Sequence, residues 1–216
     1  MKSIFLIPGF LGGKKEVKPV LDYLSKRGFF IYVPIIKGHG TEDKISPYKD
    51  WIYTIRNEFE KFQENNQEIY IIGFSMGGVL ATSLFYKPNY KIKGLVLISS
   101  AFIHIYFNSI SKYSIKEIRK DAIRKINLNI IYGARQLKLL SEEAKKNNWL
   151  SMVNRKTFVA QGDKDGMVKK ENIYYVFNNL NCEKQMKIYK GKHYLLNNEE
   201  LLEDVYNFIG GNYENS

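Results

Sequence analysis

The sequence predicts an α/β fold, with a mostly parallel sheet of about six strands flanked by helices. Short apolar runs recur along the chain, and segments with helical periodicity lie between them. The first five runs are nearly continuous apolar blocks, which is typical of strands covered on both faces. The expected strands are 4–7 (IFLI), 29–33 (FFIYV), 69–72 (IYII), 95–99 (LVLIS), 157–160 (TFVA) and 186–189 (MKIY).

Segments between these runs carry apolar residues three or four positions apart, as the buried face of a helix does. We interpret these faces as core packing. Strands that alternate with helices favour parallel pairing, because a parallel connection must cross back over the sheet. The apolar positions are Val17, Val20, Leu21 and Leu24; Trp51, Ile55, Phe59 and Phe62; Ile173, Val176, Phe177 and Leu180; and Leu201, Leu202, Val205, Phe208 and Ile209.

The alternation stops between 95–99 and 157–160, where helical periodicity continues without a clear strand. An insertion of this length over the carboxyl ends of the strands would form a cap or lid. We therefore expect a single domain, with a core of residues 1–100 and 151–216 and a helical cap of residues 101–150. The periodic apolar positions are Ile115, Ile118, Ala122, Ile126, Leu137, Leu140 and Ala144.

Composition indicates one ordinary globular domain, since 216 residues can enclose one substantial core. The net charge is +11, but the lysines are spread along the chain, so we expect a solvated basic surface and no nucleic-acid partner. Pro8 interrupts the first apolar run, and no long apolar segment follows, so we expect neither a signal peptide nor stable membrane insertion. The single cysteine, Cys182, fits a reducing cytoplasm, where we expect the protein to reside.

The segment GFSMGG contains the pattern G-x-S-x-G, formed by Gly73, Ser75 and Gly77. In this pattern the serine occupies a sharp turn between a strand and a helix, where a Cβ on either side would clash. A buried strand precedes the pattern and a helix start follows it. Ser75 is therefore our candidate nucleophile.

A serine nucleophile needs a histidine base that a carboxylate orients. His193 directly follows the last expected strand and completes the order serine, acid, histidine. His39, in a loop after the second strand, is the strongest alternative base, and His104 is better explained as a packed or surface residue. Two carboxylates, Asp163 and Asp165, follow the strand at 157–160, and their spacing allows only one to face His193.

The oxyanion of an acyl-transfer reaction needs backbone donors. We expect the N–H of Met76, which follows the nucleophile, and the N–H of Phe10, in the glycine-rich loop after the first strand, to fill this role. That loop could alternatively be only a flexible turn. We expect no metal and no cofactor, because no His or Cys pair has ligand spacing and no dinucleotide or phosphate-loop pattern occurs.

Six segments together resemble the α/β-hydrolases, and more narrowly the bacterial carboxylesterases grouped with monoacylglycerol lipases. They are LIPGFLGG, YVPIIKGHG, DWIYTIRNEFEKF, GFSMGGVLA, VAQGDKDGMV and YKGKHYLLNNEELLEDVYNFI. This resemblance covers nearly the whole chain. It implies Ser75 as nucleophile, Asp165 rather than Asp163 as the acid, His193 as base and Phe10 with Met76 as oxyanion donors.

The same resemblance makes His39 a residue that lines the site, and Gly9 is a further candidate for the substrate pocket. The chain departs from the family pattern in two respects, since Pro8 replaces the usual histidine before Gly9 and almost nothing precedes the first strand. The sheet should therefore be reduced and all-parallel. Aromatic residues of the expected cap, Phe102 and Tyr106 among them, could line an apolar pocket or only pack the cap onto the sheet.

These features predict a serine hydrolase that cleaves small-molecule carboxylic esters, with short-to-medium acyl chains or monoacylglycerols as the substrate class. A thioesterase is an alternative, because the same three side chains cleave acyl thioesters and the fold does not choose between them. A hydrolase fold used only for binding is the alternative from a different class of protein.

Overall fold

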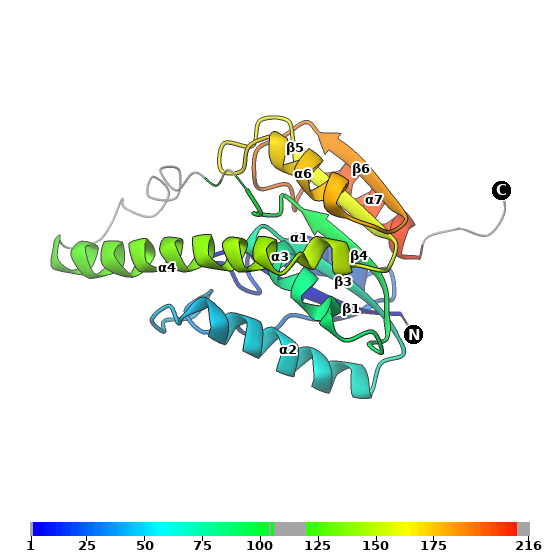
Figure 1. Cartoon of the computed structure of the whole chain (residues 1–216), viewed down its shortest axis with the longest axis horizontal. Helices are drawn as coiled ribbons and strands as arrows, with labels where there is room; N and C mark the ends of the chain where they lie inside the picture. Colours follow the sequence, from blue (N-terminus) through cyan, green and yellow to red (C-terminus); the bar gives the residue numbers. More distant parts are fainter. Residues whose placement is uncertain (1, 104, 106–119, 211–216) are drawn as a thin grey trace.

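The computed structural model describes residues 2–103, 105 and 120–210 of the chain (Figure 1). Its centre is a six-stranded sheet in the order β2-β1-β3-β4-β5-β6, and every neighbouring pair is parallel. This arrangement confirms the expected reduced, all-parallel sheet. The strands are β1 (Lys2–Ile7), β2 (Phe30–Tyr32), β3 (Glu68–Phe74), β4 (Ile92–Ile98), β5 (Thr157–Gly162) and β6 (Lys184–Tyr189).

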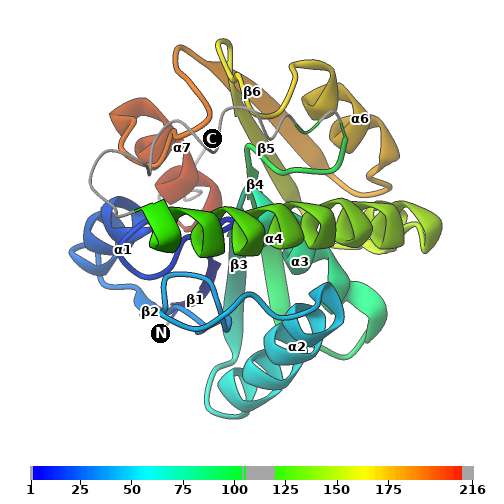
Figure 2. The same cartoon turned by 90° about the vertical axis from the view of Figure 1, so that its left-hand side faces the viewer.

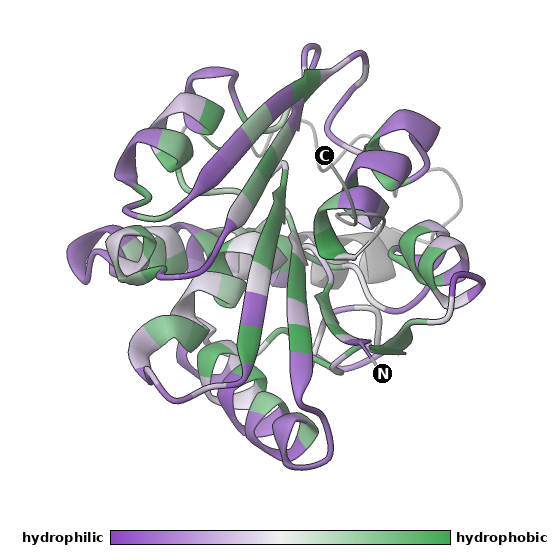
Figure 3. Cartoon of the chain, turned by 90° about the vertical axis from the view of Figure 1, so that its right-hand side faces the viewer, coloured by the Kyte–Doolittle hydropathy of each residue, from purple (hydrophilic) through white to green (hydrophobic). Residues whose placement is uncertain are grey.

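Helices cover both faces of the sheet, because successive residues of a buried strand point to opposite sides. Phe5 and Ile7 of β1 pack with α2 to α6 on one face, while Ile4 and Leu6 pack with α1 and α7 on the other. Figure 3 shows hydrophobic residues along the central strands and polar residues on the outer sides of the helices. The helices are α1 (Lys18–Ser25), α2 (Tyr48–Glu64), α3 (Met76–Thr82), α4 (Lys120–Lys146), α5 (Trp149–Met152), α6 (Glu171–Asn179) and α7 (Glu199–Ile209), with a 3₁₀ turn, η1 (Ser83–Tyr86), after α3.

Strand β2 differs from the expectation that it would be covered on both faces. It has three residues and lies at the edge of the sheet, where it pairs only with β1. Phe30 is 45% exposed. The apolar run at 29–33 therefore predicts the strand correctly but not its burial, because an edge strand has a neighbour on one side only.

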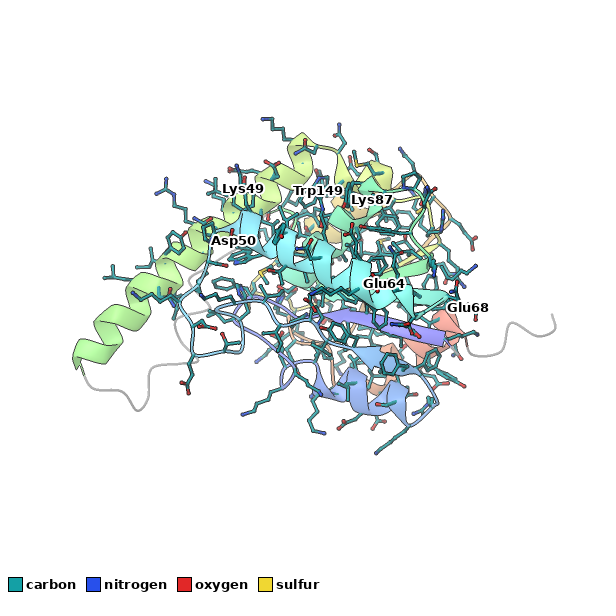
Figure 4. The ribbon with its side chains drawn as sticks, turned by 90° about the horizontal axis from the view of Figure 1, so that it is seen from below. Lys49, Asp50, Glu64, Glu68, Lys87 and Trp149 are labelled. Carbon is teal, nitrogen blue, oxygen red and sulfur yellow. The ribbon has the colours of Figure 1, made fainter. Side chains whose placement is uncertain are left out.

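Helix α2 has the expected apolar face, on which Trp51, Ile55 and Phe59 are fully buried. Its opposite side is charged: Figure 4 shows this helix from outside, and Lys49 and Glu64 mark its two ends. Both of these residues are exposed. The helix thus supports the sheet from one side and presents an ordinary solvated surface on the other.

Residues 101–150 contain the long helix α4 and the start of α5. The carboxyl-terminal half of α4 packs on the core through buried Leu137 and Leu140. Its amino-terminal half projects beyond the rest of the fold (Figure 1), and Figure 2 shows α4 running across the sheet. Leu128 and Ile131 on this half are 62% and 65% exposed. The expected positions Ile115 and Ile118 lie outside the described residues.

We propose that residues 101–150 act as a cap over the carboxyl ends of the strands. Among the described residues, none of the helices combines the length and the apolar character that crossing a membrane requires.

Candidate active site

Ser75 lies at the junction between β3 and α3, at the carboxyl edge of the sheet. Its backbone has φ 53° and ψ −116°, a left-handed conformation that is costly for a residue with a side chain. The backbone of the next strand holds this turn, because the Ser75 N–H donates to the carbonyl of Ile98 at 2.9 Å. The turn between strand and helix thus projects the Ser75 hydroxyl from the end of the sheet.

The glycines around Ser75 are required by close backbone contacts. A Cβ on Gly77 would lie 2.2 Å from the carbonyl oxygen of Ile7 and 2.6 Å from that of Pro8. A Cβ on Gly73 would lie 2.5 Å from the carbonyl oxygen of Gly77. No side chain fits at these distances, so the glycines allow α3 to start directly against the end of β1.

A chain of hydrogen bonds connects Ser75, His193 and Asp165. The Ser75 Oγ is 3.0 Å from His193 Nε2, and His193 Nδ1 is 2.8 Å from Asp165 Oδ2. The side chain of Asp165 is 1% exposed and that of His193 is 11% exposed. A carboxylate only accepts hydrogen bonds, so Nδ1 donates to Asp165, and Nε2 faces the serine hydroxyl.

The two candidate carboxylates have different partners. Asp165 uses its second oxygen, Oδ1, to accept the N–H groups of Met167 and Val168, each at 2.9 Å. Asp163 accepts the N–H of Gly191 at 2.9 Å and makes no contact with His193 in the described structure. Asp163 thus ties the loop after β5 to the loop after β6, whereas Asp165 reaches the imidazole.

Two further contacts position His193. The Ser99 hydroxyl donates to the His193 carbonyl at 3.0 Å, and the ring of Phe74 lies 5.3 Å from the imidazole, centre to centre. Ser99 itself follows β4 and is fully buried. His193 is therefore held through both its backbone carbonyl and its ring.

The expected oxyanion donors are the backbone N–H groups of Phe10, which precedes Ser75 in the chain, and Met76, which follows it. Met76 is the first residue of α3, so its N–H has no acceptor within the helix. Phe10 follows β1, and its N–H makes no hydrogen bond to the described residues. The preceding N–H, that of Gly9, donates to the carboxyl group of Glu16 at 2.7 Å.

His39 is buried, and His193 rather than His39 is the histidine hydrogen-bonded to the hydroxyl of Ser75. The ring of His39 makes edge contacts with Phe10 and Trp51, with ring centres 5.5 Å and 4.6 Å away. Burial lowers the pKa of His39 to about 4, because a charged imidazole would lose its water. The loop of His39 also contacts the loop after β1, since the Gly40 N–H donates to the Leu11 carbonyl at 3.1 Å.

A cavity of about 650 Å³ opens above Ser75 and His193. Most of its wall is apolar, and its polar side chains include Glu16, Lys164 and Lys192. The apolar lining comes from the loops after β1 and β5, from the end of β3, from Ile105 and from α4: Phe10, Phe74, Ile105, Leu137, Met167 and Val168. This cavity can take the apolar part of a small molecule whose reactive atom reaches Ser75.

The remaining expected pocket residues are not on this wall. Phe102 is 1% exposed and packs in the core beneath α4, because its short connection from β4 directs it inward. Gly9 and His39 each contact a residue of the wall, since the Gly9 N–H donates to Glu16 and the His39 ring packs against Phe10. Tyr106 and His104 lie outside the described residues.

Glu16 is a site residue that the sequence reasoning missed. It lines the cavity together with Ser75 and His193 although it belongs to the turn before α1. Burial raises the pKa of its carboxyl group to about 7, against the opposing effects of the Gly9 N–H and of His193. In sequence it follows a pair of glycines and a pair of lysines, in GGKKEVK, and is interpreted as a surface charge.

In the described residues, no three His, Cys, Asp or Glu side chains gather closely enough to hold a metal ion. The site combines a serine, a histidine and carboxylates around an apolar cavity. This is the arrangement that serves nucleophilic acyl transfer in hydrolases.

The family model described as "alpha/beta hydrolase fold" matches residues 2–115, more than half of the chain. The protein therefore belongs to the α/β-hydrolase family. This membership confirms the family and the fold class that the sequence motifs indicate.

Individual proteins agree with this assignment. The chain is 27% identical to a carboxylesterase of Bacillus subtilis (strain 168) over 234 aligned residues, which cover 96% of this chain and 92% of that protein. It is 31% identical to a thermostable monoacylglycerol lipase of Bacillus sp. (strain H-257) over 102 residues, 46% of this chain and 40% of the lipase. An esterase from Exiguobacterium antarcticum shares the fold with a TM-score of 0.71 at 12% identity, with 97% of this chain and 92% of the esterase covered.

Proposed function

We propose that this protein is a serine hydrolase that cleaves carboxylic esters through an acyl-enzyme on Ser75. The observation that carries the proposal is the hydrogen-bond chain from Ser75 through His193 to Asp165, at 3.0 Å and 2.8 Å. These distances are within the reach that proton transfer needs. The similarity to a carboxylesterase over nearly the whole chain supports the same reaction class.

In the first half of the proposed reaction, the Ser75 Oγ forms a bond with the ester carbonyl carbon while His193 Nε2 takes the hydroxyl proton. The resulting imidazolium faces the buried carboxylate of Asp165, which stabilises its charge. Collapse of the tetrahedral intermediate breaks the carbon–oxygen bond to the alcohol, and Nε2 returns the proton to that oxygen. The acyl group then remains on Ser75.

In the second half, a water molecule repeats the attack on the acyl-enzyme. His193 takes a proton from the water as its oxygen bonds to the acyl carbon. Collapse of the new tetrahedral intermediate breaks the bond between this carbon and Ser75 Oγ and releases the carboxylic acid, while His193 Nε2 returns the proton to Oγ. The backbone N–H groups of Phe10 and Met76 serve both intermediates as donors to the negatively charged oxygen. Among the residues that the structure describes, neither N–H group donates to another acceptor.

The cavity supports esters with an apolar acyl or alcohol group as the substrate class. Its volume, about 650 Å³, lies in the range of pockets for small molecules. Short-to-medium acyl chains and monoacylglycerols combine such an apolar part with one ester bond.

Hydrolysis of p-nitrophenyl esters from acetate to laurate tests this function. We expect turnover that depends on chain length in the unchanged protein and no turnover above background in Ser75→Ala. Equal turnover by both proteins would refute Ser75 as the nucleophile. Ester binding without turnover by either protein would instead support a hydrolase fold used for binding.

A further inference from the structure

The carboxyl group of Glu16 lies inside the cavity although its residue belongs to the turn before α1. It lines the cavity together with the hydroxyl of Ser75 and the imidazole of His193. One of its oxygens, Oε2, accepts the N–H of Gly9 at 2.7 Å. Gly9 immediately precedes Phe10, so this hydrogen bond fixes the peptide next to the proposed oxyanion donor.

The glycines of the loop after β1 make room for this carboxyl group. A Cβ on Gly12 would lie 1.9 Å from Oε2 of Glu16, and a Cβ on Gly9 would lie 3.3 Å from both carboxyl oxygens. Neither glycine has a left-handed φ. Space for Glu16, rather than backbone conformation, is therefore a reason for glycine at position 12.

The other side of Glu16 is tied to the loop that carries His193. The hydroxyl of Tyr194 donates to the backbone carbonyl of Glu16 at 2.8 Å. Tyr194 follows His193 directly in the chain, and its ring makes an edge contact with Phe74, with centres 5.9 Å apart. Glu16 thus joins the loop after β1 to the loop after β6, and both loops contribute to the candidate site.

We propose that Glu16 is a positioning residue of the active site: its carboxyl group holds the Gly9 N–H and thereby aims the Phe10 N–H at the oxyanion. This inference rests on the proposed function for its kinetic consequence. The contact between Glu16 and Gly9 can be measured without it.

The charge of Glu16 adds a pH dependence to this role. His193 and Tyr194 face it from the loop after β6, and Lys164 and Lys192 line the same cavity. Because the pKa of Glu16 is raised to about 7, its carboxyl group gains negative charge between pH 6 and pH 8.5. A negative charge in the cavity opposes a second one on the oxyanion. The neutral carboxyl group keeps an oxygen that accepts from Gly9.

Kinetics of two Glu16 variants test the positioning role, with Glu203→Gln, a surface carboxylate bonded by Tyr23, as the matched control. We expect Glu16→Ala to lower kcat about tenfold at pH 6 with little change in KM, since the hydrogen bond that holds the Gly9 N–H is lost. Glu16→Gln keeps an acceptor and should recover most of this loss at pH 6. The ratio of the Glu16→Gln rate to the rate of the unchanged protein should rise about threefold from pH 6 to pH 8.5, because only the unchanged protein gains a negative charge in the cavity.

Unchanged kcat in Glu16→Ala, a loss confined to KM, or equal losses in the Ala and Gln variants at pH 6 would overturn the proposal. Gly12→Ala supplies a second route, because its Cβ would displace the carboxyl group without removing it. It should lower kcat as Glu16→Ala does, and full activity in this variant would contradict the inference.

The contact itself is measured by NMR on protein labelled with ¹⁵N-glycine, which gives few signals because the chain has 16 glycines. The Gly9 amide signal should shift with pH around a midpoint near 7 in the unchanged protein and lose this transition in Glu16→Gln. A Gly9 signal that titrates identically in both proteins would overturn the proposal. If the unchanged protein has no esterase activity, the proposed function fails, while this signal still decides whether Glu16 holds Gly9.

Discussion

Asp165 accepts the Nδ1–H of His193 at 2.8 Å from a nearly fully buried position, with its side chain 1% exposed. A carboxylate in such surroundings must be held by hydrogen bonds, and two backbone N–H groups of its own loop supply them. The loop after β5 therefore fixes Asp165, and Asp165 fixes the imidazole. The candidate site depends on this order of support.

Asp165→Asn and Asp163→Asn should have very different effects on catalysis. We expect Asp165→Asn to lower kcat by about a thousandfold or more, because the amide favours the wrong tautomer of His193. Asp163→Asn can still accept the Gly191 N–H and should lower kcat less than about threefold. Steady-state kinetics on p-nitrophenyl butyrate, with circular dichroism to verify folding, checks both values. A larger loss in Asp163→Asn would reverse the assignment of the acid.

Ser75→Gly should be more stable than Ser75→Ala although both lack the hydroxyl. The φ of 53° at this position is accessible to glycine but strained for alanine, so we expect a difference of about 1 kcal/mol in the free energy of unfolding. Urea denaturation of the two variants measures it. Equal stabilities would mean that the turn relaxes when the hydroxyl is absent.

Gly77→Ala should damage the fold as well as the site. Its Cβ would meet the backbone carbonyls of Ile7 and Pro8, which cannot rotate away as a side chain can. We expect a loss of about 3 kcal/mol or more in the free energy of unfolding. Gly166→Ala is the matched control, because a Cβ there meets nothing within 4 Å. Thermal unfolding in which both variants behave alike would refute the close contact.

His39 should make the protein less stable in acid. Its pKa is about 4 in the folded protein against 6.5 for the free side chain, so the unfolded chain binds more protons between these values. Its contribution to stability is therefore full above pH 6.5 and falls as the pH drops toward 4, by about 3 kcal/mol in total. Glu16 has the opposite dependence, because its raised pKa favours the folded state at low pH.

The difference between the unchanged protein and His39→Phe isolates the His39 effect, since Glu16 is present in both. Urea denaturation at pH 7.5 and pH 5 should show the unchanged protein losing more stability than the variant. A loss of equal size in both proteins would contradict the buried, neutral state of His39.

The strands and their parallel direction could be predicted from the sequence, because strands buried on both faces leave continuous apolar runs and helices alternate with them. The helices that cover them were equally visible, as the buried face of α2 illustrates. The exposure of β2 was not, since an apolar run of the same kind occurs in central and edge strands. Edge position depends on the strand order, which no local pattern encodes.

The candidate site shows the same division. Ser75 and His193 could be found because a turn motif and the chain order identify them, and the structure brings their side chains together. Asp165 and Asp163 could be separated only through a family pattern, since two residues of one turn look alike in sequence. Glu16 left no signal, because its proposed role depends on the close approach of its carboxyl group to Gly12 at the cavity wall, which only the folded chain creates.

The most direct test of the account is fluorophosphonate labelling followed by intact mass and peptide mapping. We predict one adduct per chain, located on Ser75 and absent from Ser75→Ala. Labelling should be strongly slowed in Asp165→Asn, because the hydroxyl then lacks a properly oriented base. No adduct, or an adduct that persists in Ser75→Ala, would contradict the claim that this site works through a serine nucleophile.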